Sequence, residues 1–185
     1  MDGVFYQDSR EPFIAADIPA VTLATTAKAL YPASNFPVLG GQYFARYGKK
    51  IRIRLFGRIT TALTPGNGNF AVYYGSGADA TGVLLASSAA VALTASQTSL
   101  SWQAEIFVHC RTPGNAGALF VTGSAKFNVG VIASTLQPVL LPASAPVVSA
   151  ACDLTAANII SVQYLRSGST VETMQVHDME VTAMN

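Results

Sequence analysis

Apolar and polar side chains alternate along most of this chain, and the alternation is clearest over residues 99–127, SLSWQAEIFVHCRTPGNAGALFVTGSAKF. Every second residue from Trp102 to Cys110 is apolar, and the residues between them are mostly polar. A period of two places one side of an antiparallel strand on a core and the other side in water. Because Pro113, Gly114 and Asn115 interrupt the pattern with turn residues, the stretch predicts two strands joined in a hairpin.

The same alternation predicts further strands on both sides of this hairpin. Residues 63–68 (LTPGNG) predict a tight turn, and residues 166–169 (RSGS) predict a second hairpin. Pro142 and Pro146 predict an edge strand where they fall, because proline cannot donate to a sheet ladder. Residues 83–93 are alanine-rich and have helix propensity, but their helical face is poorly defined, which favours a strand. The other expected strands are 20–26 with an extension to 28–31, 42–47, 50–61, 69–74, 127–134, 139–151, 158–165 and 170–184.

About nine or ten such strands without a helical counterpart predict an all-β fold: a single antiparallel β-sandwich of jelly-roll type over residues 20–185. Residues 1–19 have no period and predict an extended N-terminal arm. Its aromatic residues Phe5, Tyr6 and Phe13 are candidate partner-binding residues, and a frayed terminus is the alternative.

Composition favours association with other protein. Half of the 185 residues are apolar and 11% are charged, against about 25% in an average globular domain, so little charge repulsion separates copies. A monomer with a plain surface is the alternative. The net charge of +1 offers nucleic acid or a membrane no general attraction, so neither partner is expected. No signal peptide and no transmembrane stretch is recognisable. Cys110 and Cys152 predict two buried reduced thiols, with a disulfide as the alternative.

Positive charge is concentrated in one region: six of the eleven lysines and arginines fall between Arg46 and Arg58. Alternation places three of the arginines on one strand face, where they either grip an acidic protein surface, a sulfated glycan or nucleic acid, or face carboxylates of this protein. Those carboxylates are the C-terminal Glu172, Asp178 and Glu180 or a neighbouring subunit's acidic arm. The candidate partner-binding arginines are Arg46, Arg52, Arg54 and Arg58.

Residue types that carry catalysis are scarce, so we expect no enzyme, no cofactor and no metal site. His109 and Glu105 share a strand face, but two ligands are too few for zinc. Cys110 faces away from its neighbour His109, which argues against a catalytic pair. His177, with Asp178 and Glu180 after it, holds a divalent ion only if a neighbouring subunit adds ligands.

One block of the sequence resembles a known group. Residues 51–61 (IRIRLFGRITT), followed by a Pro-Gly turn, an aromatic strand ending in glycine and a tryptophan-led hairpin, resemble tailed-bacteriophage virion proteins with a jelly-roll fold. The resemblance covers residues 40–134. The matching positions are Ile51–Thr61, Pro65, Gly66, Val72–Gly75, Trp102, Glu105, Arg111, Gly114, Gly117 and Gly123.

This resemblance implies a structural protein of the virion, assembled in the host cytoplasm. The expected role is a capsid decoration protein that binds the outer head surface as a homotrimer, with the major capsid protein or another virion protein as partner. A receptor- or glycan-binding tail or fibre domain is the alternative, and a small hydrolase is the least supported reading. An RNA-virus shell protein is disfavoured because the N-terminal arm is acidic rather than basic.

Overall fold

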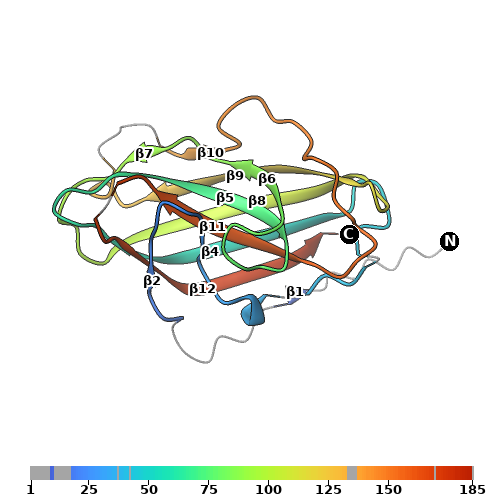
Figure 1. Ribbon diagram of the computed structural model, residues 1–185, viewed down its shortest axis with the longest axis horizontal. Helices are drawn as coiled ribbons and strands as arrows, with labels where there is room; N and C mark the ends of the chain where they lie inside the picture. Colours follow the sequence, from blue (N-terminus) through green and yellow to red (C-terminus); the bar gives the residue numbers. More distant parts are fainter. Residues whose placement is uncertain are drawn as a thin grey trace.

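The fold is a sandwich of two antiparallel sheets (Figure 1). The computed structural model describes residues 9–10 (backbone only), 18–36, 38–41, 43–132, 137–168 and 170–184. The larger sheet contains β1 (Ser9–Arg10), β2 (Val21–Thr22), β12 (Thr173–Met184), β4 (Lys50–Thr60), β8 (Leu100–Thr112), β9 (Ala118–Phe127) and β10 (Val139–Leu141). The smaller sheet contains β3 (Lys28–Ala29), β11 (Ile159–Arg166), β5 (Asn67–Gly75), β6 (Val83–Ser87) and β7 (Val91–Ala92). One short 3₁₀ helix, η1, spans Ala33–Asn35.

Strand pairing is nested, which confirms the predicted jelly-roll sandwich. The antiparallel pairs β2·β12, β3·β11, β4·β8 and β5·β6 lie one inside the next along the chain. Such nesting folds a long double-stranded ribbon across two sheets, as in a jelly roll. β9 and β10 then extend the larger sheet beyond β8, so β10 lies at its edge.

The core fills the space between the sheets with the inward side chains that the alternation predicted. Phe70 lies at its centre, with ring centroids 5.5 Å from Trp102, 4.8 Å from Tyr164 and 5.8 Å from Phe127. Edge-to-face and tilted contacts of this kind add to the stabilisation that apolar burial provides. Both cysteines are buried free thiols, so that prediction is confirmed.

Several predicted strands differ from the structure. Of the expected strand 139–151 only Val139–Leu141 (β10) forms one, and of 20–26 only Val21–Thr22 (β2) does. Residues 43–48 form turns instead of a strand, with Gly48 in the left-handed region at φ 77°. Residues 128–131 also form a turn, in which Val131 N–H donates to Asn128 O. The stretch 83–93 divides into β6 and β7, because Ser88 turns out of the ladder and its Oγ accepts from Phe70 N–H at 3.0 Å. The apolar and polar residues do alternate in these stretches. Turns and the Ser88 hydrogen bond nevertheless prevent a continuous strand.

The predicted hairpin at residues 166–169 is wrong. β11 belongs to the smaller sheet and β12 to the larger one, so the connection crosses between sheets. Arg166 fixes this crossing: its Nε donates to Leu23 O at 2.9 Å and lies 2.8 Å from Glu172 Oε2 as an ion pair. The Glu172 side chain is fully buried and accepts a further bond from Thr170 Oγ1. The turn sequence was recognisable, but its two flanking strands separate onto different sheets.

The region predicted as an N-terminal arm is partly integrated into the sandwich. β1 pairs with β12, and Ile18 is buried with its carbonyl accepting from Gln175 Nε2 at 2.8 Å. Phe5, Tyr6 and Phe13 lie outside the described residues. Among the described residues, no helix is long and apolar enough to span a membrane.

Candidate interaction surface

The outer face of the larger sheet, here called the open face, carries the predicted arginine stripe. Its outward side chains come from β4, β8, β9 and β12, and alternate residues of β4 and β8 are half-buried or exposed. Among the described side chains, six cationic and three acidic ones lie on it, which gives a formal charge of +3. They are Lys50, Arg52, Arg54, Arg58, Arg111 and Lys126, and Glu105, Asp178 and Glu180.

Carboxylates and an amide of the same chain engage the three stripe arginines. Arg52 Nη2 lies 2.6 Å from Glu180 Oε1, and Arg54 lies 3.4 Å from Glu180 and 3.6 Å from Glu105. Arg58 Nε donates to Gln175 Oε1 at 2.9 Å. The interpretation that the stripe faces carboxylates of its own protein is therefore confirmed for Glu180.

Neither of the other two expected carboxylates forms an ion pair with the stripe arginines. Glu172 pairs with Arg166 at the crossing between the sheets, and Asp178 is exposed opposite Phe56, where β12 contains a bulge. Hydrogen bonds from Thr182 and Arg52 lower the pKa of Glu180, which keeps it ionised beside the arginines. The middle of the open face is thus largely neutralised within one subunit.

A second group of cations lies at the end of the sandwich where β4 begins and β8 ends, on the right in Figure 1. We call it the basic end, and it comprises Arg46, Lys49, Lys50 and Arg111. Backbone bonds between residues 48–49 and Cys110 hold the loop before β4 against the end of β8. No carboxylate among the described residues forms an ion pair with these four cations.

Aromatic rings lie beneath these charges. Lys50 Nζ is 4.3 Å from the ring centroid of Phe107, Arg111 Cζ is 4.3 Å from that of Phe120, and Lys49 Nζ is 5.0 Å from that of Tyr43. Such contacts hold a cation over an apolar surface while it stays accessible. Burial lowers the pKa of His109, and the charges of Lys50 and Arg111 lower it further. The basic end is therefore a region of positive potential whose cations lie over aromatic rings.

Sequence reasoning grouped Arg46 with the stripe and missed Arg111. The structure separates Arg46 from Arg52, Arg54 and Arg58 by placing it in the turn before β4. Arg111 joins it through the pairing of β4 with β8. The available signal was the alternation of residues 100–112, which put Arg111 on the polar side of a strand.

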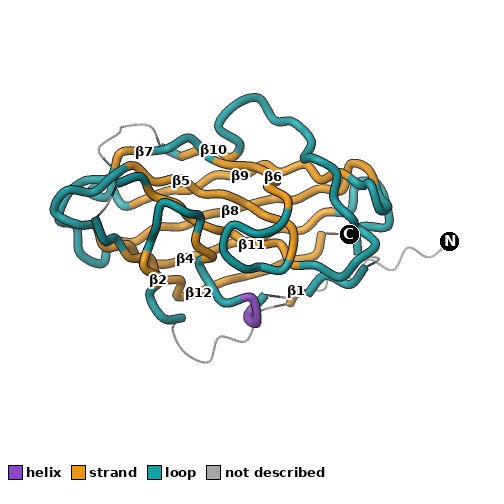
Figure 2. The backbone as a smooth tube through the Cα atoms, viewed as in Figure 1, coloured by secondary structure: helices purple, strands orange, loops and turns teal. Residues whose placement is uncertain are grey.

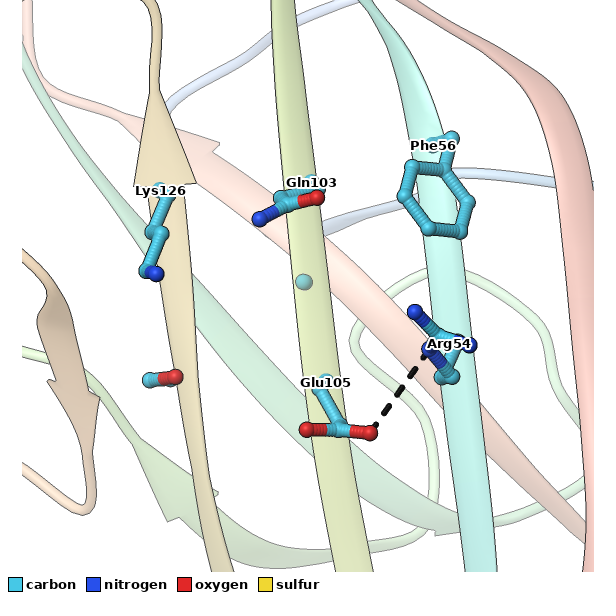
Figure 3. A pocket seen from close by; sticks show the side chains of 7 residues that line it. Arg54, Phe56, Gln103, Glu105 and Lys126 are labelled. Carbon is cyan, nitrogen blue, oxygen red and sulfur yellow. Dashed lines mark ion pairs between the residues drawn. The ribbon is translucent and has the colours of Figure 1, made fainter.

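A small polar basin of about 110 Å³ lies in the middle of the open face (Figure 3). Figure 3 shows Arg54 and Phe56 on one strand, Gln103 and Glu105 on the next, and Lys126 beyond them. The basin offers hydrogen-bond donors and acceptors beside one aromatic ring. It has the chemistry for a hydroxyl-bearing or carboxylate group, although typical ligand pockets are larger, about 300–1,000 Å³.

One edge of the sandwich is without charge. From Phe127 to Cys152 the sequence contains no Asp, Glu, Lys or Arg. The described part of this stretch follows β9: β10 pairs with it, Ala143 N–H donates to Ser87 O of β6, and Ser149 N–H donates to Leu119 O. Figure 2 shows the loop after β10 standing out from this edge. Four large apolar side chains among the described residues between Phe127 and Cys152 are exposed. Their exposed fractions are 91% for Val129, 61% for Leu140, 70% for Val147 and 52% for Val148.

Residues with catalytic or metal-binding chemistry are dispersed. Within the described ranges, no group of three or more His, Cys, Asp or Glu is placed to hold a metal ion. Cys110 is buried and its Sγ lies 3.3 Å from Phe44 O, while His109 contacts Phe120 on the open face. Burial raises the pKa of the Cys110 thiol, which disfavours the reactive thiolate.

Comparison with known proteins gives little. No family model and no curated protein matches the chain. Among solved structures, one similar chain is the binding domain of botulinum neurotoxin DC in complex with SialylT, with 10% identity and a TM-score of 0.26. The likeness covers 97% of this chain and 44% of that one, so this chain spans less than half of its length. At this TM-score the likeness carries no argument about fold or ligand.

Proposed function

We propose that this protein is a structural component of a tailed-bacteriophage particle. Its role is that of a capsid decoration protein, which assembles as a homotrimer and binds other virion protein on the outer head surface. The resemblance of residues 40–134 to phage jelly-roll virion proteins supports the setting. The nested pairing of the two sheets agrees with the fold that this resemblance implies.

The observation that carries the proposal is the uncharged edge at residues 127–152. Monomeric proteins rarely expose large contiguous apolar patches, and natural edge strands are usually protected by charges. Here Leu140, Val147 and Val148 are exposed, and the described residues of this edge include no charged side chain. A surface of this kind suits contact with another protein, and the low charge of the chain removes a barrier to self-association.

The proposal is tested on particles. Virions purified from cells that carry the gene are analysed by quantitative mass spectrometry. We expect peptides of this chain at a fixed ratio to the major capsid protein, in multiples of three copies per capsomer. The protein's absence from intact particles, at a detection limit of one copy per particle, would contradict the proposal.

A second candidate function, glycan binding, is favoured by the basin of Figure 3. Its mixed donors and acceptors beside Phe56 match the recognition of sugar hydroxyls. Glycan-array binding that is lost in Gln103→Ala and retained in Lys28→Ala would support this candidate, because Lys28 pairs with Asp79 outside the basin. If no glycan on the array binds the wild-type protein, glycan binding is contradicted.

A further inference from the structure

The basic end has a charge that the described residues of one subunit do not balance. Arg46, Lys49, Lys50 and Arg111 lie there, whereas Glu180 and Glu105 form ion pairs with Arg52 and Arg54 of the nearby stripe, and Gln175 accepts a hydrogen bond from Arg58. Arg46 is exposed, and Tyr47 beside it is 73% exposed. This combination of free cations and accessible rings fits an acidic segment that also carries aromatic side chains.

The chain itself contains a segment with that chemistry. Residues 1–8, MDGVFYQD, include two aspartates, Phe5 and Tyr6, and neither lysine nor arginine. The side-chain charge of residues 1–8 is −2, whereas the basic end carries four cations. The segment and the basic end are therefore opposite in charge.

β1, the strand that follows this segment, begins at the end of the sandwich that carries the basic end. Ser9 pairs with Thr182 and Arg10 with Val181, at the end of β12 next to Lys50, which pairs with Met184. β1 is antiparallel to β12, so the chain before Ser9 leads from the same end of the sandwich that carries the basic end. Eight residues reach at most about 26 Å when extended, which is several strand spacings. This length is enough to reach a second copy that contacts this end of the sandwich.

We propose that residues 1–8 of one copy bind the basic end of a second copy. Asp2 and Asp8 pair with its cations, and Phe5 and Tyr6 pack beside Phe107, Phe120 and Tyr47. The contact joins two different surfaces, and a rotation that closes such a head-to-tail contact produces a ring such as a trimer. This inference rests on the proposed self-association and adds to it a named surface and a named partner segment.

Carbodiimide cross-linking of mixed light and isotope-heavy protein tests the contact directly. The reagent joins a carboxylate to a neighbouring lysine amine, so the expected product links residues 1–10 to Lys49 or Lys50. Light–heavy pairs should make up about half of these links after subunit exchange, because a neighbour is drawn at random from equal pools. Lys28 and Asp79, 2.7 Å apart in one subunit, give an internal positive control for the reaction.

Charge reversal gives the functional readout. Lys50→Glu with Arg111→Glu should raise the dissociation constant of the oligomer at least tenfold, and adding Asp2→Lys with Asp8→Lys should restore it. Lys126→Glu, a cation on the same face away from this end, is the matched control and should leave assembly unchanged. Thermal unfolding of each monomer shows whether the fold is intact.

The outcomes separate this inference from the proposed function. A wild-type protein that is monomeric at every concentration overturns both. An oligomer that persists without residues 1–8, or links confined to light–light and heavy–heavy pairs, overturns the inference alone and assigns the contact to another surface or to the same subunit.

Discussion

The outer face of the smaller sheet is covered by a loop, whereas the outer face of the larger sheet is accessible. On the smaller sheet, the loop between β5 and β6 lies over β11 (Figure 2), and seven of the eight residues of β11 are buried. Gln163 holds this loop: its Oε1 accepts from Ala80 N–H at 2.8 Å and its Nε2 donates to Ala78 O at 3.0 Å. On the larger sheet, the outward side chains of β4 remain half-buried or exposed. The protein closes one face for stability and leaves the other accessible, which is why we place its contacts on the larger sheet and its edge.

The largest effect should come from the buried pair at the crossing between the sheets. Arg166→Leu leaves Glu172 as an uncompensated buried charge, and such losses cost about 3–5 kcal/mol. Urea unfolding should show this loss, whereas Arg52→Leu on the open face should cost much less. Equal losses in the two variants would mean that the two regions are not energetically distinct.

A smaller effect is expected where the loop covers β11. Gln163→Ala removes the partner of Ala80 N–H and one of the donors to Ala78 O, which should cost about 1 kcal/mol. Hydrogen exchange should accelerate at residues 76–81 and remain unchanged in β4. If the amides of residues 76–81 exchange as slowly in this variant as in wild type, Gln163 does not hold the loop in place.

On the open face, removing a stripe arginine should change stability little. Arg54 is 39% exposed and shares Glu180 with Arg52, so Arg54→Ala should cost about 0–1 kcal/mol. The measurement is again urea unfolding, at low and at high salt. A loss comparable with that of Arg166→Leu would show that the stripe is a structural network rather than an accessible surface.

The smallest effect is a pH dependence at the basic end. Because the pKa of His109 is lowered in the fold, the unfolded chain binds its proton first as pH falls through about 6.5. His109 therefore contributes to stability above that pH, and the contribution is lost below it. The melting temperature of wild type minus that of His109→Gln should fall between pH 7.5 and pH 5.5, and a rising difference would contradict the assignment.

Much of the fold could be predicted from the sequence because the larger sheet has one buried and one solvent-exposed face. Alternation identified β4, β8 and β9 with their inward residues, including Trp102 and Cys110. It could not reveal which sheet a strand joins, so the turn after Arg166 was mistaken for a hairpin. Residues 43–47 contain enough apolar side chains for a strand, but local glycines and turn hydrogen bonds prevent one.

The candidate surface was predictable only in part. Residue spacing placed Arg52, Arg54 and Arg58 on one face, which the structure confirms. Their partners depend on long-range pairing: Glu105 arrives on β8 and Glu180 on β12, and no local pattern identifies either as the counter-charge. For the same reason Glu172 was assigned to the stripe, although it is buried beside Arg166.

Together, the two proposals predict that the uncharged edge and the basic end of the larger sheet contact other protein, first of all copies of this chain. Sedimentation equilibrium over a wide concentration range measures this association. From the subunit mass of 19.3 kDa, we expect a trimer of about 58 kDa that dissociates when Val147 and Val148 are both changed to Asp, but not in Leu63→Asp at a similarly exposed position elsewhere. A mass of one subunit at all concentrations would contradict it.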